Sequence, residues 1–358
     1  MKYAEIEKMG SAVSNLMLPR RVGFVDGTSK PRVGDVVIVK ALSESSTYGN
    51  LELPSGRLAK INTGDVLLGV LGKRRALKGF VGDVPETVNA GDKLHLLNMG
   101  GVIGLCKGHH SSFSDAIEVE VIGVACTEGE SILNIGDNAL KPANELNASA
   151  PIVVIAGTCM NSGKTVAATE LIKQAANSGL KVAGAKMSGI ACLRDTLHMQ
   201  DHGAVATASF VDCGLPSTVD FGDLAPIAKA ILNHLNTFEP DVIVVELGDG
   251  IVGGYSVDSV LKDQEIRDAI ASFVFCASDY VGVIGGMSVL DGLGIDVDVI
   301  AGSVTDSQMG EDFITQKFGV QAGNARRNGK RLFELISSKL GAVPVVEGVN
   351  INEAAVTA

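Results

Sequence analysis

The sequence predicts an α/β domain with a mainly parallel sheet and helices on both faces, preceded by a smaller N-terminal all-β domain, a barrel or a sandwich. Short apolar runs between glycine and aspartate turns fill the first third of the chain, and from residue 151 onward apolar strands alternate with amphipathic helices. The 358 residues, 46% of them hydrophobic, are enough for two cores. We place the β domain at residues 1–145, the α/β domain at 150–345 and a C-terminal tail at 346–358.

The β domain is predicted from the apolar runs "DVVIVKAL", "DVLLGVLG", "KLHLL" and "IEVEVIGVAC", which are rich in valine, isoleucine and leucine. Gly34, Gly64 and Gly91 each precede an aspartate just before such a run. A glycine there suits a turn that needs a positive φ. This pattern favours a compact antiparallel fold between about residue 32 and residue 125. The stretch 134–151, with mixed polarity and no clear period, marks the domain boundary.

The α/β domain is predicted from its order of elements. The strand "IVVIAG" leads to a helix that ends at Gly179, and the strands "KVAGAK", "DVIVVELG", "SFVFCAS" and "DVDVIAGSV" follow. Helices are expected in "LAPIAKAILNHLNTF" and around 308–318 and 326–339. Parallel neighbours need crossover helices, and this alternation supplies them.

Composition favours a small-molecule ligand. The net charge of −11 argues against a nucleic-acid partner, because that affinity comes from lysine and arginine on phosphates. Six cysteines without C-x-x-C spacing indicate reduced thiols, with neither disulfides nor a zinc site. No apolar run long enough to span a membrane and no signal-peptide pattern appears. We therefore expect a soluble cytoplasmic protein with no membrane partner.

The segment "GTCMNSGKT" matches G-x-x-x-x-G-K-[ST] between a buried strand and a helix, which predicts a P-loop NTPase fold. The glycines let backbone N–H groups face phosphate oxygens, Lys164 neutralises the β and γ phosphates, and Thr165 offers a hydroxyl to Mg²⁺. The expected nucleotide-binding residues are Gly157, Thr158, Asn161, Ser162, Gly163, Lys164, Thr165 and Val166.

A second expected part is an acid at the end of a buried strand, which holds Mg²⁺ or polarises the attacking group. "DVIVVELGDG" places Glu246 after four apolar residues and Asp249 in the glycine-rich loop that follows. Glu246 is the stronger candidate of the two.

The segment 151–191 resembles the opening of dethiobiotin synthetases, in which a G-T-x-x-x-x-G-K-T loop and its helix lead to a second strand ending in lysine, with Ser-Gly shortly after. "VIVVELGDG" is similar to that family's Val-Glu-Gly-x-Gly-Gly segment. "DTLHMQDHGA" resembles a helix of the P-loop adaptor of molybdopterin-guanine dinucleotide biosynthesis, with Asp195 in the corresponding place. The resemblance covers about residues 151–305.

This resemblance implies that Lys186 and Ser188 reach the γ phosphate or the acceptor, and that Asp195 or Glu246 helps to hold Mg²⁺. The predicted substrate-side residues are Lys186, Ser188, Asp195, Gly248 and Asp249, and the predicted metal ligands are Thr165, Asp195 and Glu246. A lysine at the end of a parallel strand adjacent to the P-loop strand also lies over the edge where ligands bind. Relatives of this branch place sites across a two-fold axis, which implies a homodimer.

The chain departs from that family at three places. Cys159 stands where dethiobiotin synthetases usually carry an acid, and "IAGSVTDSQ" offers Ser303, Thr305 and Asp306 where the family has an asparagine that reads adenine. The β domain has no counterpart in a plain dethiobiotin synthetase. The base therefore stays open between ATP and GTP.

The predicted function is Mg²⁺-dependent ATP or GTP binding, with hydrolysis or with phosphoryl transfer to a small anionic acceptor such as a carboxylate, in a ligase-like or kinase-like enzyme. The expected catalytic residues are Lys164, Lys186 and Glu246. One alternative is a slow nucleotide-dependent switch or adaptor for a partner protein. Another is a P-loop fold that binds coenzyme A, or another phosphate-bearing cofactor, without cleaving a triphosphate.

Overall fold

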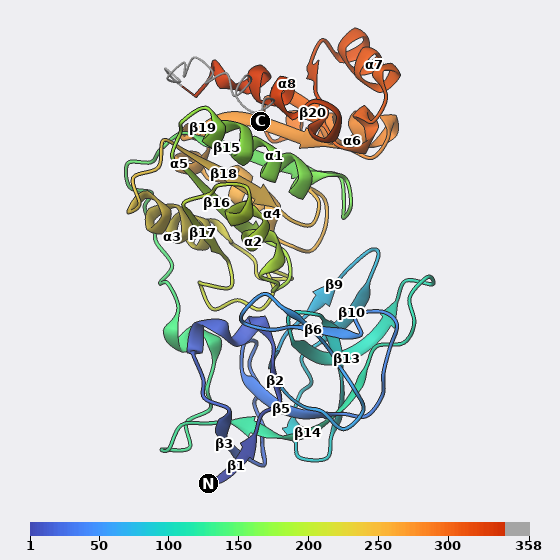
Figure 1. Cartoon of the computed structure of the whole chain (residues 1–358), viewed down its shortest axis with the longest axis vertical. Helices are drawn as coiled ribbons and strands as arrows, with labels where there is room; N and C mark the ends of the chain where they lie inside the picture. The colour runs from blue at the N-terminus through green and yellow to red at the C-terminus, as the bar shows by residue number, and fades with distance from the viewer. Residues whose placement is uncertain (341–358) are drawn as a thin grey trace, which may run out of the picture.

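The computed structural model describes residues 1–340, which form an N-terminal β domain and an α/β domain arranged along the long axis of the molecule (Figure 1). The predicted tail at 346–358 and the last residues of the predicted α/β domain, 341–345, lie outside the described residues. Within residues 1–340, no helix has the length and apolar character needed to cross a bilayer.

The β domain contains many short strands and two 3₁₀ turns, η1 (Ser11–Leu16) and η2 (Ile135–Asn138). Its strands are β1 (Lys2–Glu5), β2 (Lys8–Met9), β3 (Arg21–Val25), β4 (Gly27–Thr28), β5 (Val36–Ala41), β6 (Asn50–Glu52), β7 (Leu58–Lys60), β8 (Val66–Leu71), β9 (Arg74–Arg75), β10 (Phe80–Asp83), β11 (Val88–Asn89), β12 (Lys93–Asn98), β13 (Val102–His109) and β14 (Glu118–Ala125). Strands thus begin well before residue 32, where the sequence pattern first indicated them.

Hydrogen bonds close a ring in this domain, because β14 pairs with β5, β5 with β8, β8 with β13, and β12 with both β13 and β14. The expectation of an antiparallel fold is wrong at two pairs, since both β13 and β2 run parallel to β8. The long connection through β9 to β12 lets β13 return in the same direction as β8, which a hairpin does not allow.

The three Gly-Asp turns share one construction. Gly34, Gly64 and Gly91 have φ values of +88°, +97° and +91°, as predicted. The aspartate after each glycine accepts a hydrogen bond from the backbone N–H three residues before it: Arg32 to Asp35 at 2.8 Å, Asn62 to Asp65 at 2.6 Å and Asn89 to Asp92 at 2.7 Å. The recurrence in the sequence therefore reflects a turn in which glycine supplies the backbone angle and aspartate closes the loop.

Within residues 1–340, the α/β domain has seven strands in one parallel sheet. Its elements are β15 (Ile152–Gly157), α1 (Lys164–Asn177), β16 (Val182–Ser188), α2 (Arg194–Asp201), β17 (Ala206–Ser209), α3 (Ala225–Asn236), β18 (Val242–Leu247), α4 (Val257–Lys262), α5 (Gln264–Asp268), β19 (Ile270–Cys276), α6 (Tyr280–Gly292), β20 (Val299–Ala301), η3 (Ser303–Thr305), α7 (Gln308–Phe318), β21 (Gln321–Ala322) and α8 (Ala325–Ser337).

Alternate residues of the central strands face opposite cores, as the pleat requires. Val153 and Ile155 of β15 pack with α1 and α8, whereas Val154 and Ala156 belong to the core that contains α3, α4 and α6. The prediction of a parallel sheet with helices on both faces is confirmed.

The strand order is β17-β16-β18-β15-β19-β20-β21. We expected the strand of Lys186 to lie beside the P-loop strand, and this expectation is wrong, because β18 lies between β15 and β16. The crossover through α1 spans one strand position, which β18 fills later in the chain. Lys186 is instead the register partner of Glu246 on β18, and Glu246 is that of Ile155 on β15. Strand β18 thus places Glu246 between Lys186 and the P-loop strand.

Gly302, in the loop after β20, packs closely against the P-loop. A Cβ on Gly302, whose φ is +90°, would lie 2.2 Å from the carbonyl oxygen of Ser162 and 2.8 Å from that of Ala277. Only glycine fits this position, so the backbone after β20 packs directly against the P-loop and supports it.

We predict that Gly302→Ala lowers the free energy of unfolding by about 3 kcal/mol, because it adds backbone strain and overlap with fixed backbone. Gly319→Ala is the matched control, since Gly319 also has a positive φ of +66° but a methyl group there would meet nothing within 4 Å. The control should cost only about 1 kcal/mol. Urea denaturation measures both, and equal losses in the two variants would contradict this account.

Candidate functional site

The loop between β15 and α1 has the backbone shape of a phosphate cradle. Gly163 has a φ of +103° and Asn161 a φ of +64°, and a Cβ on Gly157 would lie 2.5 Å from Ser162 Oγ. No side chain caps the start of α1, so its first N–H groups are free for a ligand. The buried Ser162 Oγ has no hydrogen-bond partner. These features fit an anion at the helix N-terminus.

Lys164 is 6% exposed, and its ammonium donates to two carbonyl oxygens, that of Cys159 at 2.8 Å and that of Asp249. Burial lowers the pKa of Lys164, because the charged form is poorly solvated. Within residues 1–340 no carboxylate lies at ion-pair distance from this ammonium. Its charge is therefore available to a phosphate.

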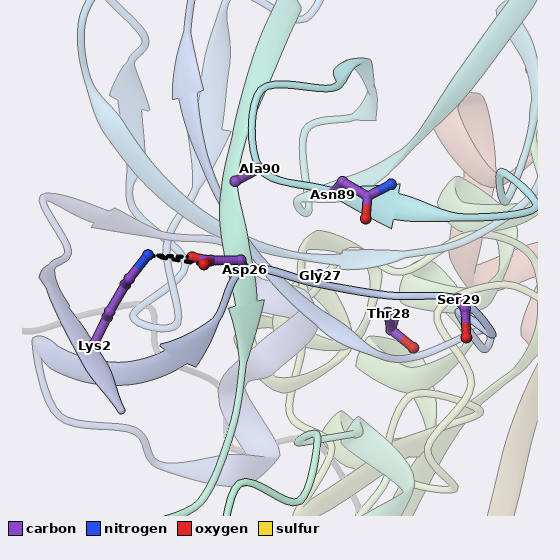
Figure 2. Close-up of a pocket in the computed structure, with 7 residues that line it drawn as sticks. All are labelled: Lys2, Asp26, Gly27, Thr28, Ser29, Asn89 and Ala90. Carbon is purple, nitrogen blue, oxygen red and sulfur yellow. Dashed lines mark hydrogen bonds and ion pairs between the residues drawn. The ribbon is translucent and has the colours of Figure 1, made fainter.

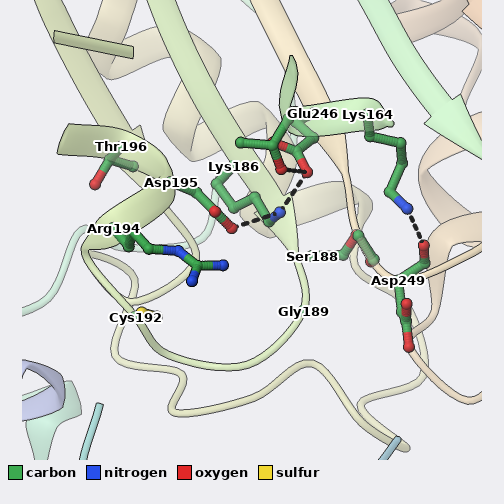
Figure 3. A network of polar contacts seen from close by, with 12 residues as sticks. Lys164, Lys186, Ser188, Gly189, Cys192, Arg194, Asp195, Thr196, Glu246 and Asp249 are labelled. Carbon is green, nitrogen blue, oxygen red and sulfur yellow. Dashed lines mark hydrogen bonds and ion pairs between the residues drawn. The ribbon is translucent and has the colours of Figure 1, made fainter. Parts of the chain in front are cut away.

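Four side chains beside the P-loop form one polar network, and Figure 3 labels three of them, Lys186, Asp195 and Glu246. Thr165 Oγ1 donates to Glu246 Oε1 at 3.0 Å, and Lys186 Nζ donates to the same oxygen at 2.6 Å. Lys186 Nζ also lies 2.8 Å from Asp195 Oδ2. The network thus brings together residues from α1, β16, α2 and β18, all of which the sequence had singled out.

The charges in this network determine its protonation. Burial opposes the charge of Lys186, but the Asp195 and Glu246 carboxylates outweigh it and raise the pKa of the lysine. Burial likewise opposes ionisation of Asp195, and Lys186 outweighs it and lowers the pKa of that carboxyl. Two carboxylates around one ammonium leave a net negative charge, which suits a divalent cation.

Thr165 and Glu246 have the donors that Mg²⁺ prefers, a hydroxyl and a carboxylate oxygen 3.0 Å apart. The second oxygen of Glu246, Oε2, is buried and has no partner, so it is ready to accept one. No cluster of three or more histidine, cysteine, aspartate or glutamate side chains that could hold a metal occurs within residues 1–340. Mg²⁺ in phosphate sites needs only one or two protein ligands beside phosphate and water, so the pair fits it. Asp195 as a metal ligand stays a prediction, because Lys186 occupies one of its oxygens.

The loop after β18 forms another wall of the site. Ser188 is fully buried, and its hydroxyl donates to the carbonyl oxygen of Gly248. A Cβ on Gly248 would lie 3.2 Å from Lys186 Nζ, so the backbone of the loop approaches the lysine closely. Burial raises the pKa of Asp249, and its Oδ1 is buried without a partner. This carboxyl therefore has unused acceptor capacity.

A small cavity of about 30 Å³ opens beside the P-loop. Its lining residues are Asn161, Gly163, Val166, Gly302, Ser303, Asp306, Asn324, Ala325 and Arg326. Of the three residues that stand in place of the family's asparagine, Ser303 and Asp306 line the cavity, whereas Thr305 is fully buried and donates to the carbonyl oxygen of Gly302. Sequence reasoning missed Asn324, whose Nδ2 donates to Asp306 Oδ1 at 2.8 Å. The only local signal was an asparagine just before a predicted helix, which is a common position for an N-cap.

A larger hollow of about 520 Å³ lies on the β domain, lined by Lys2, Asp26, Gly27, Thr28, Ser29, Asn89 and Ala90 (Figure 2). Its ion pair, Lys2 to Asp26 at 2.6 Å, has both side chains 63% exposed. A solvated pair in an open hollow binds little, so the P-loop edge is the better candidate site.

No protein-family model and no curated protein matches this chain. Solved structures similar to it include the chloroplast FtsY of Physcomitrella patens, with 13% identity, a TM-score of 0.37 and coverage of 49% of this chain and 58% of that one. The signal recognition particle receptor FtsY of Elizabethkingia anophelis has 13% identity, a TM-score of 0.37 and coverage of 54% and 66%. The 54 kDa signal recognition particle protein of Aeropyrum pernix K1, in complex with GDP, has 19% identity, a TM-score of 0.35 and coverage of 55% and 49%.

This chain thus spans about half to two thirds of the length of those structures. TM-scores this low carry no inference about function. The chain's own strand, glycine loop and helix, in a parallel α/β sheet, are what identify a P-loop fold.

We predict that Asp195→Asn lowers the free energy of unfolding by about 2 kcal/mol at pH 7, because Lys186 loses one charged partner. The folded pKa of Asp195 is lowered, so its contribution is complete above the unfolded value of about 3.9 and is lost as the pH falls through the folded value. The gap between wild type and variant should therefore close in acid. Urea denaturation at a series of pH values measures it.

Asp258→Asn is the control, because its pair with Lys262 on α4 is more than half exposed at both side chains and should matter little. If the difference in free energy of unfolding between wild type and Asp195→Asn did not depend on pH, loss of the ion pair with Lys186 would not be its cause.

Proposed function

We propose that this chain is a Mg²⁺-dependent nucleoside triphosphatase, whose α/β domain binds a nucleoside triphosphate at the P-loop and cleaves off the γ-phosphoryl group. The network of Thr165, Glu246, Lys186 and Asp195 at the carboxyl edge of the sheet carries this proposal. It sets a hydroxyl, an ammonium and two carboxylates beside an anion cradle, which is the set that phosphoryl transfer needs.

The chain's own groups then have separate tasks. Backbone N–H groups of residues 163–165, at the uncapped start of α1, hold the phosphates, and Lys164 leaves its two carbonyl partners for the β and γ phosphate oxygens. Lys186 neutralises charge that develops on the transferred group. Thr165 and Glu246 would hold Mg²⁺, which supplies further charge neutralisation on the phosphates when bound.

Asp249 suits the role of proton acceptor. Its raised pKa and its unpartnered oxygen favour taking the proton of the attacking water or hydroxyl as the new oxygen–phosphorus bond forms and the bond to the β phosphate breaks. The nucleoside diphosphate leaves with the electron pair of that bond.

A small anionic acceptor, as in the resemblance to dethiobiotin synthetases, is supported by cations of the β domain. Arg74 is 1% exposed, and within residues 1–340 no carboxylate pairs with it. Its positive charge lowers the pKa of Asp249, although burial of Asp249 raises that pKa by more. Arg75 and Lys73 reach Asp220, whose N–H donates to the carbonyl oxygen of Gly254 in the loop after β18. Asp83 and Asp220 already balance Arg75 and Lys73, so the charge of Arg74 is what favours a carboxylate-bearing acceptor over a neutral one.

The alternatives are separated by turnover and binding. A slow switch would hydrolyse nucleotide only when a partner protein is added, whereas an enzyme responds to a small acceptor. A coenzyme A site would bind coenzyme A and leave triphosphates intact. A homodimer stays a prediction, which sedimentation tests.

We predict that Lys164→Ala lowers kcat/KM for triphosphate hydrolysis by about 100-fold or more, because the phosphates lose their buried cation. Lys229→Ala is the matched control: Lys229 is a buried lysine on α3 that pairs with Asp263 and Glu265. Phosphate release with ATP and GTP, and calorimetric binding with ATP, GTP and coenzyme A, measure both variants. Unchanged hydrolysis in Lys164→Ala would sink the proposed function.

We also propose that the base binds at the mouth of the cavity beside the P-loop, whose volume of about 30 Å³ takes only the edge of a base, and that the base is guanine. Asp306 lines the cavity, and a carboxylate accepts from both N–H donors on the guanine edge. Adenine offers one donor and one acceptor at that edge, which matches a carboxylate less well.

Asp306→Asn should therefore weaken GTP binding by about 10-fold or more and improve binding of xanthosine triphosphate, because the amide donates where the carboxylate accepted. Competition binding with ATP, GTP and xanthosine triphosphate measures this. Ser307→Ala is the neighbouring control, since Ser307 caps α7 through its hydroxyl and does not line the cavity. A variant that keeps the wild-type order of affinities would exclude Asp306 from base recognition.

A further inference from the structure

A buried glutamate of the β domain holds a segment of the α/β domain. Glu52, at the end of β6, is 1% exposed, and its carboxylate accepts from the N–H of Leu193 at 2.7 Å and the N–H of Arg194 at 2.9 Å. The thiol of Cys192 donates to it at 3.1 Å, and Ser11 Oγ donates from its own domain. No lysine or arginine within residues 1–340 pairs with it, so these four donors alone satisfy a buried carboxylate.

The helix that follows this segment has no cap of its own. Leu193 stands at the N-cap of α2 and its side chain accepts no hydrogen bond. Glu52 supplies the missing acceptor from the other domain, at the end of the helix where a negative charge is favourable. The start of α2 is therefore fixed by a residue about 140 positions earlier in the chain.

Two further contacts seat the same segment on the β domain. Asn98 Nδ2 donates to the carbonyl oxygen of Ala191 at 2.6 Å. A Cβ on Gly100 would lie 2.1 Å from that oxygen, and a Cβ on Gly56 would lie 2.4 Å from Leu197 Cδ1 on α2. The backbones approach so closely at these points that the segment has little room to shift.

The segment leads directly to the network beside the P-loop. Asp195 is the next residue after Arg194, and it is 2.8 Å from Lys186, which in turn is 2.6 Å from Glu246 (Figure 3). A displacement of the first turn of α2 would therefore move Asp195 away from Lys186. The ammonium of Lys186 would then pair with Glu246 alone.

We propose that Glu52 is a positioning residue for the reaction: by holding residues 192–194, it sets Asp195 against Lys186 and so fixes the lysine beside the γ phosphate. This inference rests on the proposed function, since it concerns the same site. It gives the β domain a part in the chemistry, although Glu52 touches neither nucleotide nor metal ligand.

Glu52→Gln tests this, because the amide keeps the shape of the side chain but presents an NH₂ group to two of the N–H, O–H or S–H donors. We expect kcat for triphosphate hydrolysis to fall by about 10-fold or more, with KM changed by less than about threefold, since the P-loop is untouched. Amide hydrogen exchange of a peptide covering residues 190–201 should become faster. In the Asp195→Asn background, Glu52→Gln should cause no further loss of kcat, because the two act through one contact.

Asp35→Asn is the matched control, since Asp35 is a fully buried carboxylate of the same domain that pairs with Arg32 and Asn134 and does not contact residues 191–197. It should leave kcat and the exchange of that peptide unchanged. If Glu52→Gln fails to fold, Glu52→Asp is measured in its place, because it keeps the charge but is too short to reach both N–H groups.

Three results would overturn the inference: a kcat within twofold of wild type, an equal loss of kcat in Asp35→Asn, or losses for Glu52→Gln and Asp195→Asn that add. Failure of the proposed function is distinguishable, because then the wild type neither binds nor hydrolyses triphosphates. The hydrogen-exchange comparison still decides in that case whether Glu52 holds residues 192–194.

Discussion

The ammonium of Lys186 between the carboxylates of Asp195 and Glu246 is the interaction on which the rest of the site depends. Each of the three groups is largely buried, and each would be costly to leave charged alone. Together they tie the ends of β16 and β18 to the start of α2. Through Thr165 they reach the P-loop helix, so the geometry of the phosphate site is linked to three other elements of the sheet edge.

The sequence could predict the features that depend on residues close together in the chain. The P-loop is a continuous stretch whose glycines, lysine and threonine are required by backbone angles and charge, and it formed as expected. Glu246 was found because a buried strand ends there. The strand order could not be predicted, because the handedness of a crossover does not determine how many strand positions the crossover spans. The helix α6, with its glycines at 282, 285, 286 and 292, lacked the propensity that marks a helix, and packing of Val283 and Leu290 overrides this.

Glu52 and Asn324 were beyond sequence reasoning for a different reason. Their roles arise from contacts with residues distant in the chain, and nothing near them in the sequence signals those contacts. Glu52 reads locally as an ordinary strand residue before a turn, whereas its carboxylate is buried against the α/β domain. Only the pairing of the two domains shows that a buried charge is satisfied there.

The unpartnered atoms show which part of the fold is arranged for a ligand. Ser162 Oγ, Glu246 Oε2 and Asp249 Oδ1 are three of the six buried side-chain polar atoms without a hydrogen-bond partner within the described residues, and all three lie around the P-loop. Each such atom costs about 1–3 kcal/mol when buried without a partner. A ligand that supplies the partners removes this cost only in the folded state, so binding and folding stability are coupled at this edge. The same atoms thus favour an oxygen-rich ligand that accepts from Ser162 and brings a cation to the carboxylate oxygens of Glu246 and Asp249.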